Sequence, residues 1–92
     1  MEAQEYLSKI KNISFNVIRK KKLLLEDVKD EEEFRSLTDE LLEQIFYDER
    51  EHDNFYREKG SIPVIEKEYD NLTRFSMQVL EFFNLYRQLK NY

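Results

Sequence analysis

The chain has 92 residues, no cysteine and a formal net charge of −5 at pH 7. This length suits a single domain, and without cysteine neither a disulfide nor a thiolate metal site can stabilise it, so an apolar core must do so. One Gly and one Pro, against 38% charged residues, argue against an all-β domain, which needs many turn residues, and favour long helices.

Residues 2–28 form the first expected element. Tyr6, Ile10, Ile13 and Val17 follow one another at steps of three and four residues, so they share one face of a helix. No Gly or Pro interrupts this segment. The spacing therefore predicts one helix over residues 2–28.

A dense basic run lies within this first segment. In a nucleic-acid-binding protein such a run contacts phosphates, whereas on an ordinary helix it is a solvated face that shields nearby leucines and balances acidic neighbours. Consecutive helical residues point in all directions, so the four cations cannot share one face of the helix. We therefore favour the solvated face and keep phosphate contact as the alternative. The run consists of Arg19, Lys20, Lys21 and Lys22.

The second expected helix covers residues 31–59. Asp30 can accept a hydrogen bond from the free amides of a new helix, and Glu33 completes a start that resembles a capping box. A later start near Thr38 is the alternative, and Gly60 is the expected left-handed stop. Steps of three and four residues place seven side chains on one stripe, which Phe46 and Phe55 widen: Phe34, Leu37, Leu41, Ile45, Glu49, His52 and Tyr56.

The third expected helix covers residues 62–90. Ser61 is the expected N-cap, and Pro63 lies in the first turn, where its missing amide hydrogen costs little. The last three turns are apolar around much of their circumference, more than two neighbouring helices need to cover. We therefore expect an interaction surface made of Val79, Phe82, Phe83, Tyr86, Leu89 and Tyr92.

Three helices of similar length with very short connections must run antiparallel to their chain neighbours. The sequence thus predicts an all-α, antiparallel up-down-up three-helix bundle about 40 Å long, at 1.5 Å per residue. Such a slender bundle has little interior. We expect it to pair as a homodimer.

Charge is distributed unevenly along the chain. Residues 1–29 hold seven Lys or Arg and four Asp or Glu, residues 30–59 hold four and twelve, and residues 60–92 hold four of each. The acidic middle helix argues against nucleic acid as the main partner, because its charge repels phosphates. Mimicry of a nucleic-acid backbone is a less favoured alternative to a solvated acidic face.

Glu49 and His52 form a Glu-x-x-His motif whose two ends face the same side of a helix. Dimetal helical bundles use this spacing, but they take two such motifs and two further carboxylates. We therefore favour no metal ion. We expect Glu49 and His52 to hydrogen-bond each other or the hydroxyl of Tyr69.

No combination of residues in the chain indicates catalysis. One histidine and no cysteine leave no convincing nucleophile and base, and one glycine excludes a glycine-rich phosphate loop. The longest aliphatic run, Leu23 to Leu25, is far shorter than the roughly 20 residues that span a bilayer. We expect a cytoplasmic, non-enzymatic protein-interaction module without a cofactor or a membrane segment, with a nucleic-acid-associated regulator and a metal-binding bundle as alternatives.

The opening segment also carries a family resemblance. Glu2 to Ile10, followed by Ile18, Lys21 and Leu25 at helical spacing, resembles the first helix of small phage-encoded transcriptional regulators of the ArpU type. The similarity covers under a third of the chain and does not include the family's C-terminal helix-turn-helix-like region. It implies a phage or mobile-element origin, fitting a regulatory or inhibitory protein, and carries no functional residue across.

Overall fold

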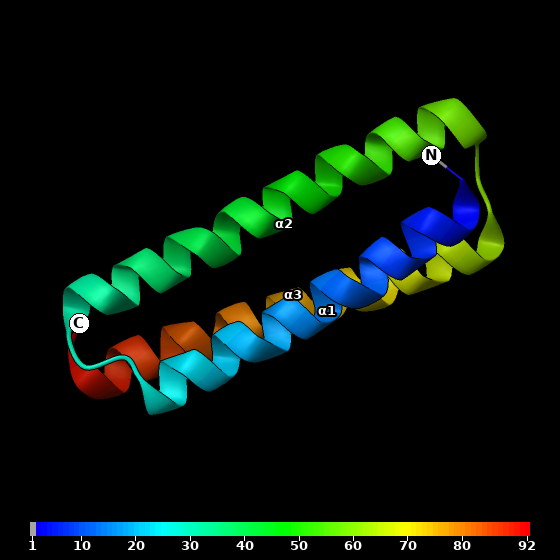
Figure 1. The fold of residues 1–92 in the computed structure, drawn as a ribbon. Helices are drawn as coiled ribbons and strands as arrows, with labels where there is room; N and C mark the ends of the chain where they lie inside the picture. Colours follow the sequence, from blue (N-terminus) through cyan, green and yellow to red (C-terminus); the bar gives the residue numbers. More distant parts are fainter. Residues whose placement is uncertain (1) are drawn as a thin grey trace.

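A computed structural model describes residues 2–92, which form three long α-helices (Figure 1). Helix α1 spans Ala3–Glu26, α2 spans Glu31–Lys59 and α3 spans Pro63–Lys90. Helices α1 and α3 run in one direction and α2 runs back between their ends, in a body of 45 × 18 × 17 Å. The predicted all-α up-down-up bundle is confirmed, and each helix begins and ends within two residues of its expected limits.

Helix α2 begins where Asp30 caps it. The backbone N–H of Glu33 donates to Asp30 Oδ1 at 2.8 Å, and Glu33 Oε2 in turn accepts from the N–H of Lys29 at 2.8 Å. Two amides near the helix start thus gain partners, while the negative charges of Glu31 and Glu32 lie favourably at the positive end of the helix dipole. The start at Asp30, and not the alternative near Thr38, is the one that the structure shows.

The connection between α2 and α3 depends on Gly60 and Pro63. Gly60 has φ 77° and ψ −166°, and its N–H donates to the carbonyl of Tyr56 at 2.7 Å. Ile62 occupies the N-cap position of α3 and Pro63 is the first helical residue, so the expected cap at Ser61 was wrong. Proline's fixed φ suits the first turn, which moves the helix start one residue beyond Ser61.

Replacing Gly60 with alanine tests this connection. The observed φ and ψ lie in a region that is essentially restricted to glycine, although a Cβ there would have nothing within 4 Å. We therefore expect Gly60→Ala to lower the free energy of unfolding by about 1–3 kcal/mol through backbone strain alone. Urea denaturation would measure this loss, with Ser61→Ala as the matched control. Equal stability of Gly60→Ala and wild type would contradict the left-handed geometry.

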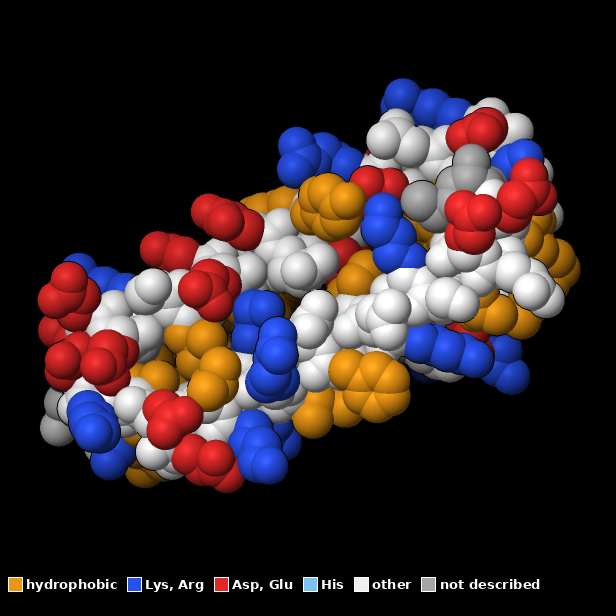
Figure 2. Space-filling model, viewed as in Figure 1, with side chains coloured by type: hydrophobic (Ala, Val, Ile, Leu, Met, Phe, Trp, Pro, Cys, Tyr) orange, Lys and Arg blue, Asp and Glu red, His pale blue; other side chains and the backbone are white. Residues whose placement is uncertain are grey.

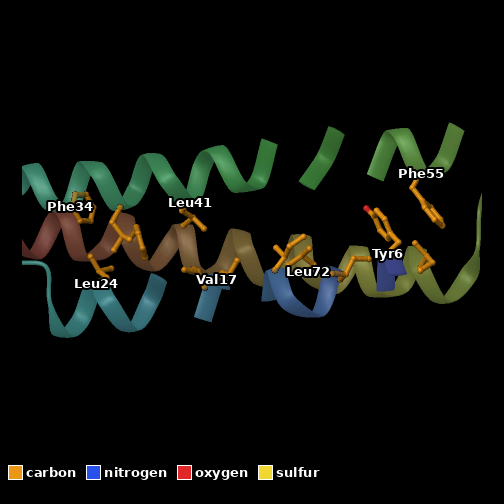
Figure 3. Packing of buried hydrophobic residues seen from close by; sticks show 13 residues of the cluster. Tyr6, Val17, Leu24, Phe34, Leu41, Phe55 and Leu72 are labelled. Atoms are coloured by element: carbon orange, nitrogen blue, oxygen red, sulfur yellow. The ribbon is translucent and has the colours of Figure 1, made fainter. Parts of the chain in front are cut away.

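The core is a row of side chains repeated every seven residues along each helix (Figure 3). A seven-residue repeat is typical of helices that wrap gently around one another at about 3.5 residues per turn. Burial of the apolar members of this row keeps the three helices together. The repeats are Ile10, Val17 and Leu24 on α1; Phe34, Leu41, Asp48 and Phe55 on α2; and Ile65, Leu72 and Val79 on α3.

Helix α1 packs more closely against α3 than α2 packs against either helix (Figure 1). The separation of packed helices increases with the size of the side chains between them. Helix α2 contributes the large rings of Phe34 and Phe55, whereas α1 contributes mainly aliphatic side chains. Lys9 on α1 also contacts α2: its Nζ lies 3.5 Å from the hydroxyl of Tyr47 and 3.6 Å from a carboxylate oxygen of Glu51.

The second half of α2 departs from the stripe expected from sequence. Asp48 and Phe55 are buried, whereas Glu49 and Tyr56, which were expected on the inner face, are exposed. The expected stripe followed about 3.6 residues per turn, so it drifted away from the seven-residue repeat after Ile45.

Within residues 2–92, none of the helices has an apolar stretch of the length needed to cross a membrane.

Candidate functional site

A groove of about 550 Å³ runs between α2 and α3 on one side of the bundle. Its lining combines five carboxylates with aliphatic, hydroxyl and aromatic side chains, and it includes neither Lys nor Arg among the residues that the structure describes. The α2/α3 groove therefore combines acidic side chains with two buried polar residues, Asp48 and Ser76. The lining residues are Ile45, Asp48, Glu49, His52, Asp53, Glu66, Tyr69, Asp70, Leu72, Thr73, Ser76 and Met77.

Asp48 is the one charged residue among the buried residues of the described chain. It is 5% exposed, and its Oδ1 accepts a hydrogen bond from Gln44 Nε2 at 2.7 Å. Burial raises the pKa of the Asp48 carboxyl to about 6, although the Gln44 hydrogen bond and the nearby charge of Lys20 act in the opposite direction. A carboxylate at a core position therefore faces both the bundle interior and the groove.

Ser76 lies on α3 and lines the same groove. Its side chain is 2% exposed, and its Oγ has no hydrogen-bond partner. Buried hydroxyls nearly always have a partner, since an unmade hydrogen bond costs about 1–3 kcal/mol. The groove thus contains a polar atom with unused hydrogen-bonding capacity.

His52 joins the two walls of the groove. Its Nε2 lies 3.1 and 3.0 Å from the two carboxylate oxygens of Glu66 on α3, and its ring stacks on Tyr69 at 3.9 Å with 7° between the planes. The expected hydrogen bond between His52 and Glu49 was wrong, because the carboxylate that His52 meets is that of Glu66 and Glu49 is exposed. Tyr69 does contact His52, but through its ring face instead of its hydroxyl.

Tyr6 lies on α1 near the carboxylates of Asp48, Glu51 and Glu66. Its ring packs on Phe55 at 4.5 Å between centroids, and its side chain extends toward α2 (Figure 3). Burial raises the pKa of the Tyr6 hydroxyl well above its usual value, and the charges of Tyr69, Asp48, Glu51 and Glu66 add to this effect. The pKa shift therefore reflects burial first, and the negative potential in this part of the bundle second.

The groove does not gather its acidic residues around one point. Among residues 2–92, no group of three or more His, Asp or Glu side chains lies close enough together to hold a metal ion. His52 and Glu66 supply two donors, whereas protein metal sites commonly use three or four. The motif residue Glu49 also lines the groove, but its side chain is exposed.

The residues of the predicted interaction surface on α3 do not form one exposed surface in the structure. Val79 and Phe83 are buried in the core and are therefore not available to a partner. Tyr86 and Tyr92 are half-buried against Phe34, with ring centroids 5.9 and 5.5 Å from it. Much of the apolar excess at the end of α3 therefore covers the first turn of α2.

The remaining members, Phe82 and Leu89, face the outer side of the α1/α3 pair. Phe82 is half-buried beneath Lys21, whose Nζ lies 4.9 Å from the ring centroid, and Leu89 is 82% exposed. Because Lys21 belongs to α1, this contact places the outer faces of α1 and α3 side by side. Together they form an apolar surface, here called the outer strip, made of Phe15, Ile18, Leu25, Phe82, Leu85 and Leu89.

The basic run is shared among several faces of α1. Arg19 bonds the side chain of Asn16, Lys20 is half-buried on the side near Asp48, Lys21 covers Phe82, and Lys22 is exposed. The four cations thus form no single surface dedicated to phosphate. Figure 2 shows acidic side chains along α2 and basic side chains over the middle of α1, with hydrophobic side chains between them.

Sequence reasoning missed Asp48, Ser76 and the pairing of His52 with Glu66. A seven-residue count from Phe34 through Leu41 leads to Asp48, so the repeat itself was the available signal for this residue. No comparable signal indicated that Ser76 would lack a partner.

Comparisons of the chain with protein-family models, with curated proteins and with solved structures give no match. The resemblance of the first helix to ArpU-type regulators therefore stays a prediction.

Proposed function

We propose that the chain is a small, non-enzymatic protein-interaction module of regulatory or inhibitory type that pairs as a homodimer. The outer strip carries this proposal. Phe15, Leu25, Leu85 and Leu89 are between 59% and 82% exposed although they lie on adjacent faces of two packed helices. Monomeric proteins rarely expose contiguous apolar patches larger than a few hundred Å², and larger ones mark binding surfaces.

A second copy of the chain suits this surface in shape. Helices α1 and α3 are parallel, so a twofold axis that runs along the helices, between the two copies, would set α1 of each copy against α3 of the other. The result is a four-helix interface, which gives a slender bundle the additional core that it lacks.

Charge favours the same arrangement. The segment of residues 1–29 is basic, so two α1 helices placed face to face would repel each other. Residues 60–92 carry equal numbers of acidic and basic residues, so α3 of a second copy presents no such repulsion. Interface specificity often depends on avoiding contacts between like charges.

Disruption of the outer strip tests the proposal. At tens of micromolar, sedimentation should give about twice the 11.4 kDa chain mass, and Leu85→Glu should give monomers with unchanged helicity. The dimer should dissociate because it would have to bury the new carboxylate at the interface without a partner. Leu85 is a better choice than Phe83, because Phe83 lies in the core and its substitution would unfold the protein.

Phe46→Glu is the matched control. Phe46 is 60% exposed on α2 and lies outside the outer strip, so this variant should remain dimeric. A monomeric wild type at about 100 µM, or equal dissociation of the Leu85→Glu and Phe46→Glu variants, would refute the proposed dimer.

A further inference from the structure

We propose that the α2/α3 groove binds a linear aliphatic polyamine, with one ammonium group held by Asp48 and Ser76. This site is separate from the outer strip and does not depend on dimerisation. Its ligand class follows from the charge, the unused hydrogen-bonding capacity, the shape and the apolar lining of the groove.

Charge selects a cation. Asp48, Glu49, Asp53, Glu66 and Asp70 line the groove, and among the described residues no Lys or Arg enters it. A cleft lined by one sign of charge concentrates ions of the opposite sign. An anionic or neutral ligand would leave this potential unbalanced.

Ser76 indicates that the ligand donates hydrogen bonds. Its Oγ is buried without a partner, and a hydroxyl oxygen can accept from an ammonium group. Gln44 occupies one site on Asp48 Oδ1, while an ionised carboxylate offers about four acceptor positions. An ammonium group has three donors and can therefore use both residues.

The spread of the carboxylates favours an elongated cation over a metal ion. No three potential metal ligands converge among residues 2–92, so one compact ion could not be enclosed by several of these side chains. The lining runs from Ile45 to Asp53 on α2 and from Glu66 to Met77 on α3, which is roughly 12–16 Å at 1.5 Å per residue. Several nitrogens spaced along a chain match this distribution.

The apolar lining suits the rest of such a ligand. Ile45, Leu72 and Met77 offer hydrophobic surface between the acidic side chains. Methylene segments of an aliphatic amine can cover this surface, just as lysine side chains cover apolar surface with their stems. Magnesium, which keeps its water shell, gains nothing from this contact.

The ionisation of Asp48 should also influence binding. Because burial raises the pKa of Asp48 to about 6, the carboxylate is fully charged only above that pH, and affinity should increase as the pH rises through 6. Lys9, Lys20 and Tyr6 on α1, Glu51 on α2 and Tyr69 on α3 are the other titratable groups near Asp48. These groups have the same protonation in wild type and variants at one pH, so a comparison of spermidine affinities at one pH isolates the effect of Asp48.

Calorimetric titration with spermidine at pH 7.5 and 50 mM salt tests the site. We expect saturable one-to-one binding, weakened about tenfold or more in Asp48→Asn and several-fold in Ser76→Ala, because the first variant loses a charged acceptor and the second loses one hydrogen bond to the ammonium group. Asp39→Asn removes the same charge from an exposed position outside the groove and should change affinity less than about twofold. Amide chemical-shift changes should concentrate around Thr73 and Ser76.

Other probes separate the alternatives. 1,8-Octanediol, which keeps the chain but not the charges, should not bind, and magnesium chloride at equal ionic strength should weaken spermidine binding only modestly. The proposal is refuted if spermidine gives no saturable signal at millimolar concentration, or if Asp39→Asn weakens binding as much as Asp48→Asn. Unchanged affinity in Ser76→Ala, or complete competition by magnesium, would refute it as well.

Discussion

Phe83→Ala should leave the domain largely unfolded on mild heating, whereas Phe15→Ala should melt almost as wild type does. Phe83 is fully buried, at 0% exposure, and its ring lies 6.1 Å from that of Phe34. Truncation of a buried Phe to Ala costs about 3–5 kcal/mol, a large share of the roughly 5–15 kcal/mol that stabilises an ordinary domain. The expected decrease in Tm is therefore roughly 15 °C or more.

Phe15 makes the matched comparison because the same side chain is removed from a surface position on α1, where it is 68% exposed. Its substitution should change stability by about 0.5 kcal/mol at most. Circular dichroism melts near 1 µM would measure both variants at a concentration where dimer formation contributes little. Similar losses in the two variants would show that the core and the outer strip had been assigned to the wrong faces.

Asp48→Asn should stabilise the protein at neutral pH and have little effect near pH 4. The folded pKa of Asp48, about 6, lies above the reference value of 3.8. The folded state consequently binds the proton more tightly, so this residue's contribution is most favourable below about pH 4 and is lost as the pH rises through 6. Asparagine retains an oxygen for the Gln44 hydrogen bond and removes the buried charge.

The expected gain in stability of Asp48→Asn follows from the pKa shift of Asp48. A change from 3.8 to about 6 corresponds to at most ~3 kcal/mol, and screening by water and by Lys20 reduces it, so we expect about 1–2 kcal/mol at pH 7.5. Urea denaturation at pH 7.5 and pH 4 would measure the difference between the two proteins. The exposed Asp39→Asn serves as control and should show no comparable gain. A destabilised Asp48→Asn at pH 7.5 would mean that the charge itself supports the fold.

The ligand proposed for the groove gives a reason for the buried charge of Asp48. A carboxylate in the core costs stability, and natural proteins retain such groups where function needs them more often than where packing does. Substitution of Asp48 by Asn would therefore separate the two roles, because it should raise stability and weaken amine binding in the same protein. A gain in stability with unchanged amine binding would leave the charge without a ligand-binding role.

The sequence by itself determined the three helices and most of their limits, although it left the start of the second helix open between Asp30 and Thr38. Helix starts and stops depend on local chemistry, so Asp30 with Glu33, Gly60 and Pro63 could be recognised from their neighbours in the chain alone. Short connections then required the antiparallel up-down-up order. The cap expected at Ser61 missed by one residue, which is the usual precision of a helix boundary.

Only the tertiary structure decided which side chains meet. Close packing of three long helices follows a seven-residue repeat. Over the length of α2 this repeat brings Asp48 to the inner face beside Phe55 and leaves Glu49 and Tyr56 exposed. The packing of α3 against α2 gave His52 its partner, Glu66. It also buried four of the six residues of the expected interaction surface wholly or in part, two in the core and two against Phe34. Such contacts join residues far apart in the chain, so they depend on the distances between helices, which local sequence patterns do not encode.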